Sequence, residues 1–138
     1  MKVKQAMHKG VQSREPSTPV AQLAKLMKSD DIGAVPITEN GKLVGMVTDR
    51  DIAVRAVAEG RDVSKATARD VMSSGLTCCG EDEEIDQAVR LMEKKGIRRL
   101  PVTNAKKQLI GMLSLGDVSH AVGQDVSGEL IKAVSAHH

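Results

Sequence analysis

In the first half of the chain, apolar positions change from helical to strand spacing in a fixed order. From Val20 to Met27 they recur on one helical face, and Thr18 is the expected N-cap with Pro19 in the first turn. Branched residues then predict two short strands around the turn Glu39-Asn-Gly41. The expected elements are a helical lead ending at Met7, an extended segment 11–14, a helix from Val20, strands 34–38 and 43–47, and a helix from about Arg50 to Ala58 closed by Gly60.

The second half repeats this order. Its expected elements are an extended segment 76–79, a helix 84–95 closed by Gly96, strands 99–103 and 109–113, and a helix opening near Gly116. Behind them, Val126, Leu130, Ile131 and Val134 predict an amphipathic C-terminal helix that needs a partner surface. The predicted organisation is a first repeat 2–60, a linker 61–66, a second repeat 67–123, and a helix and tail 124–138.

The two halves are also similar residue by residue. Val20-Ala-Gln-Leu-Ala-Lys-Leu-Met27 matches Ile85-Asp-Gln-Ala-Val-Arg-Leu-Met92, a shift of 65 residues from 27 to 92. Gly45-Met-Val-Thr-Asp-Arg-Asp51 matches Gly111-Met-Leu-Ser-Leu-Gly-Asp117, a shift of 66 residues from 45 to 111. The extra residue falls in a turn, which tolerates insertion. The period exceeds those of solenoid repeats and favours two copies packed face to face.

Each copy of the glycine-to-Asp motif suits an anionic, sugar-bearing ligand. An apolar run ends in a hydroxyl residue, Thr48 or Ser114, and an Asp follows three positions later, where a helix begins. The hydroxyl and the carboxylate can reach a phosphate and a ribose diol, and the amides of such a turn favour anions. The pattern therefore predicts a duplicated binding unit.

Composition narrows the ligand class. A chain of 138 residues with 41% apolar residues can form a real core, and no apolar run is long enough to span a bilayer or to act as a signal peptide. The expectation is a cytoplasmic protein. Lys and Arg number 20 against 18 Asp and Glu, and Phe, Tyr and Trp are absent, which argues against nucleic acid as a partner. An adenine site would have aliphatic walls.

Taken together, the element order, Asp31-Ile-Gly-Ala-Val-Pro-Ile37, Gly96-Ile-Arg-Arg-Leu-Pro-Val102 and the two glycine-to-Asp motifs resemble a tandem CBS-domain pair, the Bateman module. The resemblance covers about residues 2–123, and the layout is similar to stand-alone two-CBS proteins of the hypoxic-response type in bacteria and archaea. It implies an α/β (α+β) fold of two β-α-β-β-α repeats with pseudo-twofold symmetry, plus the C-terminal helix. It also implies two clefts for adenosine-containing ligands: AMP, ADP, ATP, S-adenosylmethionine or NAD.

In such modules a cleft joins the Asp end of one repeat to the first two strands of the other. One cleft would therefore combine Thr48, Arg50 and Asp51 with Met72, Thr77, Arg98, Arg99 and Leu100. The other would combine Ser114 and Asp117 with Met7, Gln12, Gly33, Ala34 and Val35. In each, the Asp would accept hydrogen bonds from the ribose hydroxyls, in contacts worth roughly 1.5–3 kcal/mol each.

The clefts are not expected to be equivalent. Arg98 and Arg99 align with Gly33 and Ala34, and Arg50 aligns with Gly116. A guanidinium matches two phosphate oxygens at once. We therefore predict tighter nucleotide binding at the Asp51 cleft, whereas the other would draw charge from Lys9 or a second subunit.

Each of these residues has a simpler interpretation. Asp51 and Asp117 are also typical N-cap residues, a role compatible with ligand binding. The hydroxyls of Thr48 and Ser114 can satisfy the backbone at a strand end. Arg98 and Arg99 can form a solvated strand edge, with only one of them reaching a phosphate because neighbours in a strand point opposite ways.

The remaining polar and sulfur residues suggest no chemistry. Met7, Met27, Met72 and Met92 occupy equivalent repeat positions and are expected in the core. Cys78 and Cys79 are adjacent, a poor geometry for a disulfide, so we expect reduced thiols. His8 and His120 lack metal-ligand spacing, and His137-His138 resembles the remnant of a tag. No metal site is predicted.

The sequence thus predicts a non-enzymatic ligand sensor that forms a homodimer and acts on a separate, unidentified effector protein. It contains no activated nucleophile, paired catalytic carboxylates or Walker loop. The alternative is a constitutive structural dimerisation module with empty clefts.

Overall fold

The structure is a computed structural model, and it describes residues 1–73 and 75–122. The chain forms two compact units. The middle unit comprises residues 12–76, and the composite unit comprises residues 1–11 together with the described residues from Thr77 to Val122. The predicted C-terminal helix, including Val126, Leu130, Ile131 and Val134, and the pair His137-His138 lie outside the described residues.

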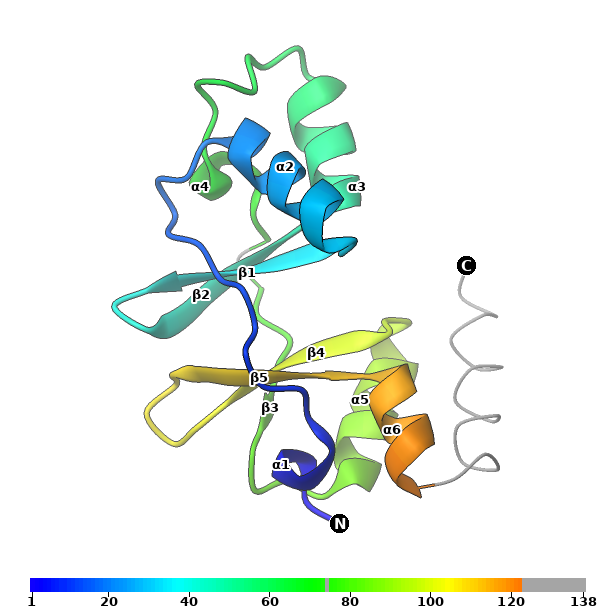
Figure 1. Cartoon of the computed structure of the whole chain (residues 1–138). Helices are drawn as coiled ribbons and strands as arrows, with labels where there is room; N and C mark the ends of the chain where they lie inside the picture. Colours follow the sequence, from blue (N-terminus) through cyan, green and yellow to red (C-terminus); the bar gives the residue numbers. More distant parts are fainter. Residues whose placement is uncertain (74, 123–138) are drawn as a thin grey trace. The chain divides into compact units, whose positions relative to one another are not determined.

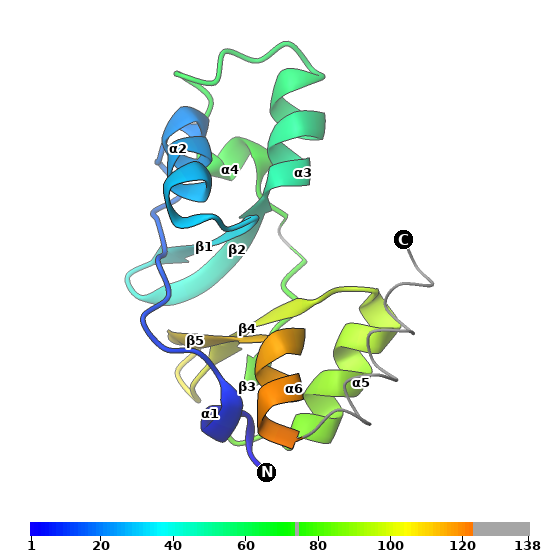
Figure 2. The same ribbon diagram turned by 45° about the vertical axis from the view of Figure 1, so that its right-hand side comes forward.

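The middle unit is a hairpin with helices on one face (Figures 1 and 2). Its elements are α2 (Val20–Asp30), β1 (Ala34–Glu39), β2 (Lys42–Thr48), α3 (Asp49–Asp51), η1 (Ile52–Val57) and α4 (Ala68–Val71). Strands β1 and β2 are antiparallel, and their turn has positive φ at Asn40 and Gly41, as tight hairpins require. Buried Val20 and Leu23 from α2 and Ile37 from β1 belong to the core between the hairpin and its helices.

The composite unit has the same plan with a third strand. Its elements are α1 (Val3–Ala6), β3 (Cys79–Gly80), α5 (Ile85–Lys95), β4 (Arg99–Thr103), β5 (Leu109–Ser114) and α6 (Leu115–Val122). Strand β3 is parallel to β4, which is antiparallel to β5. In the middle unit the equivalent of β3 is only an isolated bridge between Arg14 and Ile37. Of the segments 11–14 and 76–79, predicted to be extended, the first pairs only through the bridge at Arg14 and the second leads into the two-residue strand β3.

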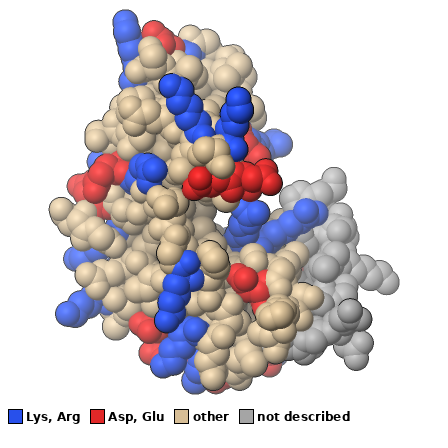
Figure 3. All heavy atoms as spheres, viewed as in Figure 1, with Lys and Arg blue, Asp and Glu red and all other residues tan. Residues whose placement is uncertain are grey.

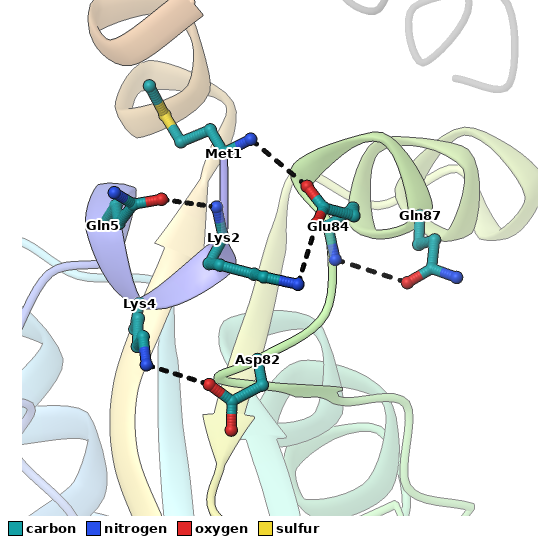
Figure 4. A network of polar contacts seen from close by, with 7 residues as sticks. All are labelled: Met1, Lys2, Lys4, Gln5, Asp82, Glu84 and Gln87. Atoms are coloured by element: carbon teal, nitrogen blue, oxygen red, sulfur yellow. Dashed lines mark hydrogen bonds and ion pairs between the residues drawn. The ribbon is translucent and has the colours of Figure 1, made fainter.

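Each sequence repeat gives its leading helix to the unit built mainly from the other repeat. Helix α1 buries Val3 in the composite core, and α4 buries Ala68 and Val71 in the middle core. Figure 4 shows how polar contacts hold α1 to the start of α5: Lys2 pairs with Glu84 at 2.8 Å and Lys4 with Asp82 at 2.9 Å. The Lys2 hydrogen bond lowers the pKa of Glu84 below its ordinary value. The compact units consequently have other boundaries than the sequence repeats.

The start of α2 corrects the predicted cap. Pro19, not Thr18, is the N-cap, and no side chain caps the helix. Backbone carbonyls do so instead: Val20 N–H donates to Ala66 O at 2.8 Å and Ala21 N–H to Val63 O at 2.9 Å. The predicted linker 61–66 is thus packed against the helix whose first amides it satisfies.

The helix after β2 also departs from expectation. It begins at Asp49, and from Ile52 to Val57 its turns are π-helical. Ala58 N–H donates to Ala53 O at 2.9 Å, and Arg61 N–H to Ala56 O at 3.0 Å, both five residues back. The equivalent α6 is an ordinary α-helix. No helix in the described residues is both long enough and apolar enough to cross a membrane.

Candidate functional site

The two strand-to-helix turns are reciprocal capping boxes. Thr48 N–H donates to Asp51 Oδ2 at 2.9 Å, and Asp51 N–H donates to Thr48 Oγ1 at 3.0 Å. Ser114 and Asp117 make the same pair of bonds at 2.9 and 3.1 Å. The hydroxyl residue is therefore the N-cap and the Asp is the third helical residue, which corrects the interpretation of Asp as the cap.

This capping leaves part of each side chain unused. Among the described residues, Oδ1 of Asp51 and Oδ1 of Asp117 accept no hydrogen bond, and the hydroxyls of Thr48 and Ser114 donate none. Both carboxylates are half-buried and locked in one orientation by the backbone amide that they bind. A structural role and a ligand role are thus compatible at the same residues.

Each turn lies beside the start of a strand in its own unit. In the middle unit Ala34 pairs with Thr48, and Asp49 N–H donates to Gly33 O at 2.9 Å. In the composite unit Arg99 pairs with Ser114, and Leu115 N–H donates to Arg98 O at 3.0 Å. Every predicted cleft takes one half from each unit. The structure defines these halves, and their pairing across the units stays a prediction.

The predicted site residues Met7 and Met72 have a packing role. A Cβ built at Gly45 would lie 2.7 Å from Met72 Sδ, and one at Gly111 would lie 2.8 Å from Met7 Sδ. Each thioether therefore lies flat on the glycine that opens the motif. With Met27 and Met92 buried, the expectation that these four methionines fill the core is confirmed.

The other predicted site residues differ in what they can offer a ligand. Val35 and Leu100 are fully buried in their own cores, so only their backbone groups remain for recognition. Gln12 is exposed and accepts a hydrogen bond from Arg14 Nη1 at 3.2 Å, and Thr77 is half-buried.

The two units differ in the charge that lies at the start of their first hairpin strand, β4 in the composite unit and β1 in the middle unit. Arg98 and Arg99 are both exposed, and neither guanidinium makes an ion pair or hydrogen bond with another described residue. At the equivalent place in the middle unit, a Cβ on Gly33 would lie 3.1 Å from Asp49 Oδ2. The prediction missed Asp49, although the repeat alignment pairs it with apolar Leu115. Over the whole face in Figure 3, acidic and basic side chains are mixed on both units, so the difference is local.

Arg55 is a second residue that the sequence did not point to. From η1 its Nη1 donates to Val71 O at 3.3 Å and to Met72 O at 3.2 Å. It therefore ties the helix that follows Asp51 to the segment carrying Met72. Its repeat equivalent is Ala121, a difference visible in the alignment. Irregular π turns are frequent at functional sites.

The sulfur chemistry of the described residues is limited. Both cysteines are free, as expected. Burial, with smaller contributions from Glu83 and Cys78, raises the pKa of the Cys79 thiol to about 12. No group of three or more His, Cys, Asp or Glu side chains in the described part of the chain is arranged to hold a metal.

Comparison with known proteins defines the family. The CBS domain family model matches residues 3–57 and again 68–124, so the chain belongs to the CBS domain family with two domains. Its relatives include the CBS domain-containing protein YhcV of Bacillus subtilis, 35% identical over 96% of this chain and 94% of that one. Hypoxic response protein 1 of Mycobacterium tuberculosis is 30% identical over 80% of this chain and 78% of that protein. The predicted resemblance is confirmed.

Solved structures confirm the mixed helix-and-strand fold of a CBS pair. Hypoxic Response Protein I, with two coordinated zinc ions, superposes with a TM-score of 0.81 at 28% identity, covering 88% of this chain and 99% of that one. The CBS pair of protein MJ0100, in complex with 5'-methylthioadenosine and S-adenosylmethionine, gives 0.76 at 28% identity, covering 87% and 94%. CBSX2 in complex with AMP gives 0.77 at 26% identity, covering 87% and 94%.

Proposed function

We propose that this protein is a non-enzymatic sensor that binds adenosine-containing ligands in two clefts, each built from one half of each unit. The observation that carries the proposal is the duplicated capping box. In each, the Asp has one carboxylate oxygen fixed by the backbone and the other unpartnered among the described residues. Such an oxygen is oriented in advance for a ribose diol. The complexes of the relatives with AMP, 5'-methylthioadenosine and S-adenosylmethionine support adenosine as the common element.

The first proposed cleft combines the Asp51 turn with Arg98 and Arg99 and prefers phosphate. Both arginines are exposed and unpaired among the described residues, so neither must break a salt bridge to bind an anion. A free guanidinium fork near a helix start is a suitable phosphate site. AMP, ADP, ATP and NAD are the ligands expected here.

In this proposal, ligand binding acts by shifting the population between two conformations of the protein. A ligand that contacts both units favours the arrangement in which its contacts are best, by as much as its affinities for the two states differ. A homodimer acting on a separate effector protein is the assembly that we propose for this signal.

Calorimetry on matched capping-box variants tests the proposal. AMP, ADP, ATP, NAD and S-adenosylmethionine are titrated into the wild type, Asp51→Asn and Asp117→Asn. Asn keeps an acceptor for the capping amide but weakens ribose binding, and we expect about tenfold or greater loss of affinity at the affected cleft. Asp70→Asn is the control, because Asp70 closes an equivalent box by accepting from Thr67 N–H at 2.9 Å and has no proposed ligand role.

Three outcomes would overturn the proposal. Equal binding by all four proteins would remove the Asp residues from the site. Thermal melts unmoved by the whole panel would favour the structural dimerisation module, since a ligand at 100 times its Kd stabilises by about 2.7 kcal/mol. Turnover of ATP that is lost in Asp51→Asn would instead make the protein an enzyme.

A further inference from the structure

Asp49 gives the middle unit's strand start a negative charge where the composite unit has positive charge. The carboxylate of Asp49 covers Gly33: Oδ2 lies 3.1 Å and Cγ 3.6 Å from the position of a Cβ at that glycine. Oδ1 accepts a hydrogen bond from Arg50 N–H at 2.8 Å, which fixes the side chain in this orientation. The composite unit has Arg98 and Leu115 at these two places.

We propose that Asp49 makes the cleft of Ser114 and Asp117 selective for adenosyl ligands without a phosphate, and above all for a cationic one such as an adenosyl sulfonium. The proposal rests on the proposed function and on the predicted combination of Gly33 and Ala34 with Ser114 and Asp117 in one cleft. A fixed carboxylate repels a phosphate dianion and attracts a sulfonium or ammonium group. The first cleft would then hold a nucleotide while the second holds a nucleoside thioether or sulfonium.

The backbone at Gly33 strengthens the argument. Because glycine has no side chain, nothing stands between the carboxylate and the strand start, and a ligand lying along Gly33 would contact Asp49 directly. Arg50 is the nearest basic residue in sequence, and its guanidinium forms no ion pair with Asp49 among the described residues. The negative charge of Asp49 is therefore not neutralised within its own unit by a salt bridge.

Three ligands that share adenosine but differ in charge test the idea. AMP, neutral 5'-methylthioadenosine and S-adenosylmethionine are titrated at low ionic strength into the wild type and Asp49→Asn. We expect Asp49→Asn to tighten AMP binding at one site by roughly three- to tenfold, to weaken S-adenosylmethionine by a similar factor, and to leave 5'-methylthioadenosine unchanged. Asp30→Asn, which removes an exposed charge at the end of α2, should change none of the three.

The double variant Asp49→Asn/Asp117→Asn assigns the effect to a cleft. If Asp49 acts where we propose, its influence disappears once Asp117 is replaced. An effect that persists in the Asp117→Asn background, or that is equal for all three ligands, overturns the charge role of Asp49 while leaving adenosine binding intact. Failure of every ligand to bind the wild type refutes the proposed function and this inference with it.

Discussion

The middle and composite units share a helix, an antiparallel hairpin and a second helix that follows the hairpin, yet they differ at the places that surround the capping boxes. The composite unit has a third strand at Cys79–Gly80, an α-helical α6 and, at its strand start, two arginines without an ion-pair partner among the described residues. The middle unit has a bridge at Arg14, a π-helical turn and a carboxylate over glycine. Under the proposed function, the shared capping boxes would recognise a ribose, and the differences between the units would determine what else each cleft binds.

The reactivity of Cys79 is the strictest test of the third strand. Cys79 exists in a buried strand that only the composite unit has, and burial raises its pKa to about 12. At pH 8 we expect it to react with a thiol reagent some hundred to a thousand times more slowly than half-buried Cys78. Single Cys→Ser variants identify each thiol. Equal rates would mean that the third strand does not protect Cys79 and would contradict this difference between the two units.

The same pKa has a consequence for stability. The folded value near 12 exceeds the ordinary thiol value of 9.0, so the unfolded state loses this proton first as the pH rises. The contribution of Cys79 to the free energy of unfolding is complete below about pH 9 and declines between about pH 9 and 12. Urea unfolding followed by circular dichroism should show this decline in the wild type and a smaller one in Cys79→Val.

Replacement of the motif glycines compares the two units through the same contact. A Cβ at Gly111 would lie 2.9 Å from His8 O, whereas one at Gly45 would lie 3.2 Å from Ser73 O. His8 is fixed by two hydrogen bonds to Met112, of 2.8 and 2.9 Å, and its carbonyl has little freedom to move. We expect Gly111→Ala to cost about 3 kcal/mol of unfolding free energy and Gly45→Ala about 1–2.

Denaturant midpoints measure that difference, and Gly75→Ala serves as the control, since a Cβ there meets nothing within 4 Å. A larger loss for Gly45→Ala than for Gly111→Ala would contradict the account based on the backbone oxygen.

The sequence predicted most of the elements that both repeats share, and of the differences in charge between the repeats it pointed only to Arg50, Arg98 and Arg99. The presence of α2, the bounds of α5, the hairpin turn and the core methionines follow from periodicity and turn chemistry, which act locally. The cap at Pro19 was missed because Val63 and Ala66 supply the acceptors from a distant segment. Asp49 and Arg55 were missed because their roles depend on contacts with Gly33 and with the carbonyls of Val71 and Met72, which residue types alone do not indicate. No local pattern in the sequence indicates that α1 and α4 each pack in the unit built mainly from the other repeat.

Arg55→Ala gives the middle unit the residue that the composite unit has at the equivalent position, Ala121. It removes the two hydrogen bonds from η1 to Val71 O and Met72 O, and we expect a loss of about 1 kcal/mol, because the side chain is exposed. Arg61→Ala is the control: its ion pair with Glu59, at 3.5 Å, is exposed and contributes little. If the two variants lose the same stability, Arg55 does not hold the Met72 segment.

The smallest expected effect comes from exchanging the residues that end α2 and α5. Both are left-handed, Asp31 with φ 52° and Gly96 with φ 65°, and only glycine adopts this conformation without steric cost. Gly96→Asp should therefore destabilise by about 1 kcal/mol, and Asp31→Gly should stabilise by about 0.5 kcal/mol, less because Asp tolerates this region better than most residues. Thermal melts of the two variants measure both signs. If Asp31→Gly destabilises the protein instead, the Asp31 carboxylate stabilises the middle unit by more than the left-handed backbone of Asp31 destabilises it.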